Sequence, residues 1–404
     1  MKTRLVYGDS YIELDFPEAV TVDCFAPGKA SRPITIDDFA TVWEGVFDLI
    51  PERPLIVVND AYRNTPTSTL LEWIDKTDGG LIDRADFLIA TGTHAAPTDD
   101  QLRKIFGSFL PRLHNRLWIH DSRKTDSMAS VGKDNFGEQV LVNRKFLEAE
   151  KPLLIGSVEP HYFAGFTGGR KSVFPGLTDL ATVERNHNLA NSLEAQPLRL
   201  EGNPVAEHLM NLSGLLDMNA MIGLQTVLDA TGAIAHISCG SLHDAFIECT
   251  AVARQLFSNV VDEPYDIVLC ELLPPLDKNL YQIQKGMENC QRGVKDGGSL
   301  VLVSHCGEGI GSRAFYDLSK TWDRVNNRPC SGPLKFGSHK LSRVINVGKR
   351  INVRVVSEVP EADVRQVFYE PLDNIYKFLF IAWNNITACR VAVVHDAGNT
   401  VLTA

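Results

Sequence analysis

Short runs of apolar residues recur along the chain, and each run ends in polar or glycine-rich sequence. These runs lie at 54–60, 85–94, 151–161, 265–272, 297–309 and 390–398. Continuous apolar runs of this length are typical of strands that are covered on both faces. Helical patterns lie between them, at 67–77 after Pro66 and at 98–109 with Thr98 as N-cap. The alternation predicts an α/β fold with mainly parallel sheets flanked by helices.

The length of 404 residues suggests two domains. A polar stretch with a proline, at 258–266, precedes a new apolar run and is a plausible boundary. We therefore expect an N-terminal domain over 1–262 and a C-terminal domain over 263–404, with the active site in the cleft between them. Residues 1–14 alternate polar and apolar side chains, as a strand does.

Composition restricts the class of partner and the compartment. The formal net charge of −10 argues against a general affinity for nucleic acid or for acidic membranes. No apolar run approaches the roughly 20 residues of a membrane helix, and no signal peptide is visible. The eight cysteines include no C-x-x-C pair, so we expect buried free thiols in a cytoplasmic protein rather than a structural zinc site.

Two strand ends carry chemically capable residues. Asp60 and Arg63 follow the first run; the guanidinium suits a carboxylate or phosphate, although the two residues could simply pair with each other. The second run ends in Thr91, Gly92, Thr93 and His94, before the helix that begins near Thr98. This turn and the helix amides could bind an anion, and a neutral His94 could be a general base or a structural loop residue.

The stretch EPHYFAGFTGGRKSVFPG, at 159–176, is the densest candidate site. His161 follows a strand, Gly168 and Gly169 allow close backbone approach to a ligand, and Arg170 and Lys171 add positive charge. The spacing of the glycines differs from that of a Walker A loop, so the stretch is only a weak indication of a phosphate loop.

Two further segments are candidates. His187, in RNHNL, is either a solvated helix residue or a metal ligand that needs other donors. The stretch from Asn279 onward reads as a helix, and Gln282 and Lys285 share one face of it, where they are either exposed or bind an oxyanion. We expect most remaining histidines, His243 among them, to be structural.

Together these segments resemble the lactate racemase family, whose members use a nickel-pincer nucleotide. The motifs are D-x-x-R-x-T-P, T-G-x-H, E-P-H-x-x-A-G-x-x-G-G-x-K-x-x-x-P-G, N-H-N and Y-Q-x-x-K, in this order between about 54 and 310. The resemblance implies a racemase or epimerase, an isomerase that inverts the α-carbon of a 2-hydroxy acid. Hydride passes reversibly to the cofactor, and two histidines act as opposing acid and base. It also implies a small-molecule substrate and contact with cofactor-biosynthesis proteins.

The resemblance also implies a role for each matching residue. His94 and His161 would be the acid/base pair, and His187 the nickel ligand. Lys171 would hold the cofactor, with or without a covalent bond. The other implied cofactor-binding residues are Asp60, Thr91, Gly92, Thr93, Gly168 and Gly169. The implied substrate-binding residues are Arg63, Tyr281, Gln282 and Lys285.

The substrate and two other classes of function stay open. The stretch at 328–340 departs from what a lactate-specific member would have, so malate, a longer aliphatic or aryl hydroxy acid, or a sugar acid remain candidates. The alternatives are a mononuclear zinc hydrolase that uses His94, His161 and His187, and a nucleotide- or sugar-phosphate-binding protein without redox chemistry.

Overall fold

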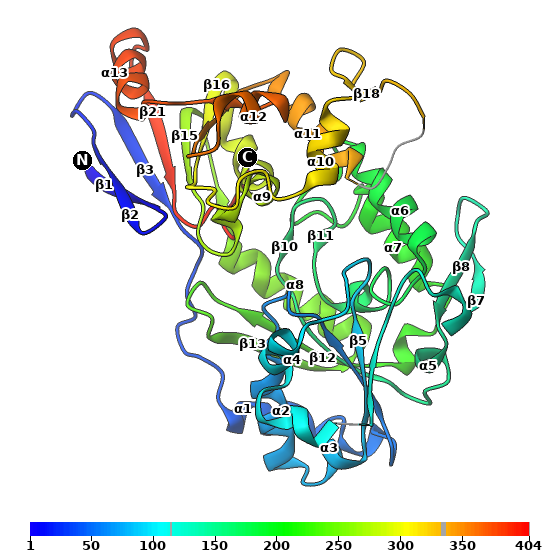
Figure 1. Cartoon of the computed structure of the whole chain (residues 1–404). Coiled ribbons are helices and arrows are strands. Elements are labelled where there is room, and N and C mark those ends of the chain that lie inside the picture. Colours follow the sequence, from blue (N-terminus) through cyan, green and yellow to red (C-terminus); the bar gives the residue numbers. More distant parts are fainter. Residues whose placement is uncertain (114, 333–336, 404) are drawn as a thin grey trace. The chain divides into compact units, whose positions relative to one another are not determined.

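The computed structural model describes residues 1–113, 115–332 and 337–403. These residues form two compact units. One unit comprises 29–189 and 198–256, and the other comprises 1–28, 190–197 and 257–404. Each unit contains a six-stranded sheet flanked by helices (Figure 1), so the predicted α/β class with mainly parallel sheets is confirmed. Among the described residues, no helix is long and apolar enough to cross a membrane.

The sheet of the 29–256 unit has the strand order β13-β12-β9-β4-β5-β6. All neighbouring strands are parallel except the antiparallel pair β12 and β13. The strands are β4 (Leu55–Asn59), β5 (Asp86–Ala90), β6 (Leu117–Ile119), β9 (Leu153–Ser157), β12 (Ile222–Leu228) and β13 (Ile234–Ser241). The chain builds outward from β4 through β5 to β6 and then returns to place β9 on the other side of β4. This reversal is where open α/β sheets bind ligands, at the carboxyl ends of the strands.

Helices cover both faces of this sheet. The helices are α1 (Ile36–Glu44), α2 (Thr67–Thr77), α3 (Leu81–Arg84), α4 (Asp99–Phe106), α5 (Arg144–Leu147), α6 (Leu180–Asn188), α7 (Pro204–Ser213) and α8 (Leu242–Phe257). Trp43 of α1 and Leu70 of α2 share one core with Ile56 and Val58 of β4. Close to β12, a Cβ on Gly223 would lie 2.9 Å from Leu242 of α8. The predicted helix at 67–77 and the Thr98 N-cap are both confirmed.

The sheet of the other unit is wholly parallel, in the order β20-β19-β16-β15-β21-β3. Its strands are β3 (Thr21–Phe25), β15 (Tyr265–Glu271), β16 (Val294–Val303), β19 (Asn352–Val356), β20 (Glu370–Pro371) and β21 (Arg390–Val394). Its helices are α9 (Leu280–Cys290), α10 (Arg313–Ser319), α11 (Ser338–Gly348), α12 (Glu361–Gln366) and α13 (Ile375–Asn385). Alternate strand residues enter two separate cores, with Val268 on one face and Ile267 on the other.

The division of the chain differs from the expected contiguous domains 1–262 and 263–404. Residues 1–14 form a hairpin of β1 (Lys2–Tyr7) and β2 (Ser10–Asp15) rather than one strand. Leu5 and Leu14 of this hairpin enter a core of the C-terminal sheet. β3 then pairs with β21, more than 360 positions later in the chain, from Thr21↔Arg390 to Phe25↔Val394. Such long-range pairing leaves no local signal that a boundary search would detect.

A buried ion pair explains why residues 190–197 belong to the C-terminal unit. The guanidinium of Arg343 donates two hydrogen bonds of 2.6 Å to the Glu288 carboxylate. It also donates to the carbonyl oxygens of Ala190 and Ser192. Arg343 and Glu288 are each 1% exposed, so the fork of the guanidinium ties the segment to α9 and α11.

We predict that Glu288→Ala lowers the free energy of unfolding by about 3–5 kcal/mol, because it leaves the buried Arg343 without its carboxylate. The matched control is Glu361→Ala, which removes the exposed Glu361–Arg365 pair on α12 and should change stability by under about 0.5 kcal/mol. Equilibrium urea unfolding followed by circular dichroism measures both. Equal effects of the two substitutions would contradict the structural role of the Arg343–Glu288 pair.

Candidate active site

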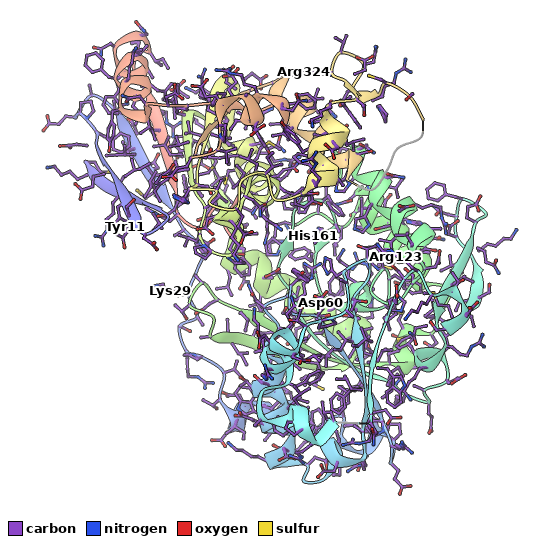
Figure 2. All side chains as sticks on the ribbon, viewed as in Figure 1. Tyr11, Lys29, Asp60, Arg123, His161 and Arg324 are labelled. Carbon is purple, nitrogen blue, oxygen red and sulfur yellow. The ribbon has the colours of Figure 1, made fainter. Side chains whose placement is uncertain are left out.

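A pocket opens at the carboxyl ends of β4 and β5, where the strand order of the sheet reverses. It contains about 670 Å³ of empty space, part of it open to solvent. Ten of the residues that the sequence singled out line it: Asp60, Arg63, Thr91, Gly92, Thr93, His94, His161, Gly168, Lys171 and His187. Asp60 and His161 are labelled in Figure 2. Parallel topology therefore brings together segments that lie more than 120 positions apart in the chain.

Asp60 is paired with His94 rather than with Arg63. The Nδ1 atom of His94 lies 2.6 Å from Oδ2 of Asp60, and Oδ1 of Asp60 accepts the backbone N–H of Tyr62. Asp60 is 6% exposed, whereas the His94 side chain is 43% exposed. A carboxylate on Nδ1 fixes the tautomer that leaves Nε2 with a lone pair, and it stabilises the imidazolium that forms when Nε2 takes a proton.

The turn that precedes His94 has few groups left for an anion. The Thr91 hydroxyl donates to the carbonyl oxygen of His120, and the Gly92 N–H donates to the carbonyl oxygen of Gly176. Helix α4 begins after Thr98, as expected, but Oγ1 of Thr98 accepts the N–H of Gln101 in a capping box. These groups shape the pocket wall and position His94, and Thr93 also lines the pocket.

His161 is held in a different way from His94. It lies on β10 (Pro160–His161), which pairs with β11 (Gly165–Phe166). Its Nδ1 accepts the backbone N–H groups of Phe163 and Ala164, at 3.5 and 3.3 Å. An Nδ1 that accepts hydrogen bonds places the proton of the neutral ring on Nε2. His161 is 8% exposed, and the Tyr162 ring stacks on it at 5.1 Å.

The Gly168–Gly169 pair is packed too closely for any other residue. Both glycines have positive φ, and a Cβ would lie 2.6 Å from Val158 at Gly168 and 2.5 Å from Phe246 at Gly169. The Gly169 N–H also donates to the side chain of Gln225 on β12. This tightly packed turn orients Lys171. Burial and the charges of Arg63 and Arg170 lower the pKa of Lys171 well below its ordinary value.

His187 has the geometry of a metal-binding imidazole. On α6, its Nδ1 donates to the carbonyl oxygen of Val183, one turn earlier, at 2.9 Å. That bond leaves the lone pair on Nε2 and fixes the ring, as a backbone carbonyl commonly does for a metal ligand. Burial, followed by the charge of Lys171, lowers the pKa of His187 to about 3. The ring is therefore neutral, which is the form that binds a metal.

The sequence reasoning missed a polar network beneath the pocket floor. Ser172 donates to Oδ1 of Asn59, the Nδ2 of Asn59 donates to Thr65, and the hydroxyls of Thr65 and Ser157 lie 2.9 Å apart. Asn59 and Ser172 both line the pocket. A polar residue at the end of an otherwise apolar strand, in the IVVND sequence, is the signal that could have found Asn59.

Tyr281, Gln282 and Lys285 lie on α9 of the other unit. Asn279 caps the helix by accepting the N–H of Gln282, which confirms the predicted helix start. The Tyr281 ring packs edge-on against Phe315, and the Lys340 ammonium lies over the Tyr281 ring, 3.8 Å from its centroid. Burial raises the pKa of the Tyr281 hydroxyl. Part of the unusual stretch at 328–340, residues 333–336, lies outside the described residues.

The fold and the pocket define an α/β protein with a basic, histidine-containing ligand site at the carboxyl edge of a parallel sheet. Sequence profiles of the lactate racemase N-terminal domain and C-terminal domain match residues 7–197 and 261–328. A lactate racemase also aligns with 99% of this chain, so the chain belongs to the lactate racemase family.

Two relatives agree with this assignment, and two solved structures share the fold. The lactate racemase of Thermoanaerobacterium thermosaccharolyticum is 31% identical over 431 residues, covering 99% of this chain and 98% of the relative. That of Lactiplantibacillus plantarum is 30% identical over 237 residues, covering 58% and 55%. The solved Thermoanaerobacterium thermosaccharolyticum apoprotein shares the fold, with a TM-score of 0.87, 23% identity and full coverage of both chains. A Thermotoga maritima protein superposes with a TM-score of 0.70, 18% identity, and coverage of 93% and 99%.

We predict that Lys171→Met raises the free energy of unfolding of the cofactor-free protein by about 1–3 kcal/mol at pH 7, because it removes an ammonium that burial disfavours. A lowered folded-state pKa means that the unfolded chain binds the extra proton, so the penalty is present at neutral pH and disappears as pH rises toward about 10.4, the ordinary lysine pKa. The stability that Lys171→Met gains should therefore become smaller as the pH rises. Lys145→Met, which breaks the Lys145–Asp86 pair, is the control and should not stabilise. A loss of stability in Lys171→Met would contradict the prediction.

Proposed function

We propose that the chain is a racemase or epimerase that inverts the α-carbon of a 2-hydroxy acid, and that lactate is the first substrate to test. The observation that supports this most is the Asp60–His94 pair in one pocket with His161, Lys171 and His187. Inversion at a carbon requires acid/base groups for both faces, and besides His187 this pocket has two imidazoles with different partners. The full-length relative named lactate racemase is consistent with the proposal.

The residues fit the nickel-pincer nucleotide that the family resemblance implies. His187 offers a neutral imidazole with its Nδ1 hydrogen-bonded, which suits a single protein ligand to nickel. Lys171 has a lowered pKa and is therefore suited to hold the cofactor, covalently or not. Gly168 lines the pocket, and its backbone is held closely against Val158, where any side chain would clash. When bound, the cofactor supplies a reversible two-electron acceptor for the hydrogen of the α-carbon.

The protein residues manage the substrate and its protons. We propose that Arg63 binds the substrate carboxylate with its guanidinium fork. Nε2 of His94 takes the hydroxyl proton, and Asp60 stabilises the resulting imidazolium. His161 presents Nε2 for the opposite step, protonation of the oxygen as the hydroxy acid is formed again. On the family resemblance, we also propose Tyr281, Gln282 and Lys285 as substrate-binding residues.

The structure gives less support to the two alternatives. Within 1–113, 115–332 and 337–403, no group of three or more His, Cys, Asp or Glu side chains is arranged to hold a metal. A zinc hydrolase with three protein ligands needs such a group. A purely nucleotide-binding protein would have no use for the carboxylate that is paired with His94. A carboxylate partner such as Asp60 would also suit a zinc-binding imidazole, so it is the lack of a three-ligand group among the described residues that disfavours the hydrolase.

The decisive experiment is to follow cofactor-loaded enzyme with D- and L-lactate in D₂O by chiral chromatography and NMR. We expect both enantiomers to interconvert and the product to retain protium at C2, since the hydrogen moves as hydride and does not exchange with solvent. A parallel panel of malate, aliphatic, aryl and sugar 2-hydroxy acids identifies the preferred substrate. Deuterium at C2 would reject the hydride route, and inversion of none of these acids would reject the proposal.

We predict that Asp60→Asn lowers kcat/KM by about 10²-fold or more, because the amide no longer fixes the His94 tautomer or stabilises its imidazolium. The matched control is Asp86→Asn, at the opposite end of the sheet, where Asp86 pairs with Arg53 and Lys145. That control should keep near-normal activity. The racemisation rate of lactate measures both. Equal rates for Asp60→Asn and the wild type would show that His94 does not depend on Asp60.

A further inference from the structure

Arg170 is a buried residue of the glycine loop that does not line the active-site pocket. It is 6% exposed, and within the described residues its Nε and Nη1 atoms have no hydrogen-bond partner. Its guanidinium lies over the Phe246 ring, 4.7 Å from the centroid. Burial lowers its pKa to about 10, and among the described residues no carboxylate forms an ion pair with it. A buried guanidinium without a counter-charge is costly, so its position needs an explanation.

A second, smaller pocket faces this guanidinium. It contains about 250 Å³ of empty space, part of it open to solvent, and shares no lining residue with the pocket that contains His94 and Lys171. Its walls are Met210 and Ser213 of α7, Met218, and residues of α8. The walls thus combine thioether and hydrocarbon surface with one cationic group.

The first turn of α8 forms the mouth of this pocket. Leu242, His243 and Phe246 line it, and α8 runs for 16 residues from Leu242 to Phe257. The amino end of a helix of this length carries a partial positive charge that favours anions. His243 is exposed and adds positive charge when it is protonated. The helix end, His243 and the guanidinium of Arg170 favour negative charge here, whereas the Asp244 carboxylate in the same first turn, held by the Ser241 hydroxyl, opposes it.

The packing of the glycine loop explains why Arg170 lies at the second pocket. Gly169 lies directly against Phe246, where a Cβ would be 2.5 Å from the ring. The next residue, Arg170, then extends across that ring, while Lys171 lines the active-site pocket. Stacking on Phe246 satisfies one face of the guanidinium. It does not satisfy the N–H groups of the guanidinium, which point outward in the plane of the fork.

We propose that this pocket, defined by Arg170, Phe246 and the first turn of α8, binds an oxyanion of a small molecule. The group is either free phosphate or the carboxylate of a short organic acid, since both match the guanidinium fork. A carboxylate with a short apolar tail would also place that tail against Met210 and Met218. The inference concerns a different pocket from the proposed active site and does not depend on the proposed function.

The experiment titrates the cofactor-free full-length protein at constant ionic strength. Inorganic phosphate is followed by ³¹P line broadening, and butyrate by saturation-transfer NMR. Arg170→Met should weaken binding by at least about tenfold, because it removes the charge-assisted hydrogen bonds. Arg63→Met separates this pocket from the active site, which also attracts anions, and should leave the Arg170-dependent binding in place. Which probe binds decides between a phosphate group and a carboxylate.

A pair of substitutions at an exposed position keeps the test valid if Arg170→Met does not fold. His243→Glu places a carboxylate at the pocket mouth, and the first turn of a helix tolerates an acid well. His243→Gln is its neutral control. We expect the Glu variant to bind at least about fivefold more weakly than the Gln variant, since it places a like charge beside the anion. Equal binding by the two variants would overturn the proposal. So would binding that depends on Arg63 alone, or no binding of either probe up to about 10 mM.

Discussion

The close packing of two glycines against a buried amide and an aromatic ring is the constraint on which the rest of the site depends. Gly169 donates to Gln225 and lies against Phe246, and Gly168 lies against Val158. Because this backbone has no freedom, the two residues that follow it are directed to different places. Lys171 lines the active-site pocket and Arg170 lines a separate one. One rigid turn thus positions two cations and keeps them apart.

The sequence pattern predicted the helices and strands that depend on residues close together in the chain. Helix periodicity and capping residues gave the helix at 67–77, the start of α4 after Thr98 and the start of α9 after Asn279. Apolar runs predicted three strands of each six-stranded sheet, namely β4, β5 and β9 in one and β15, β16 and β21 in the other. The collection of Asp60, His94, His161 and Lys171 at one pocket also follows from sequence, because parallel strands place their carboxyl ends at the same edge.

The rest depends on partners that lie far away in the chain. Asp60 was expected to bind the cofactor or to pair with Arg63, and in the structure its carboxylate pairs with His94, 34 positions later. The Thr91 hydroxyl is taken by the carbonyl oxygen of His120. The first strand of the C-terminal sheet comes from residues 21–25. Residue type indicates what a side chain can bind, whereas tertiary packing determines which atom it binds.

Two imidazoles of the pocket, those of His94 and His161, have opposite partners at Nδ1. Asp60 faces Nδ1 of His94, so a second proton on that ring meets a negative charge. The N–H groups of Phe163 and Ala164 face Nδ1 of His161, so a second proton on that ring meets two donors. In the neutral tautomers that these partners favour, His94 has its lone pair at Nε2 and His161 has its N–H there. In the reversible inversion that we propose, each ring would take the other's part when the direction changes. The fixed carboxylate on one side and the fixed amides on the other would then make the two directions chemically unequal within a single pocket.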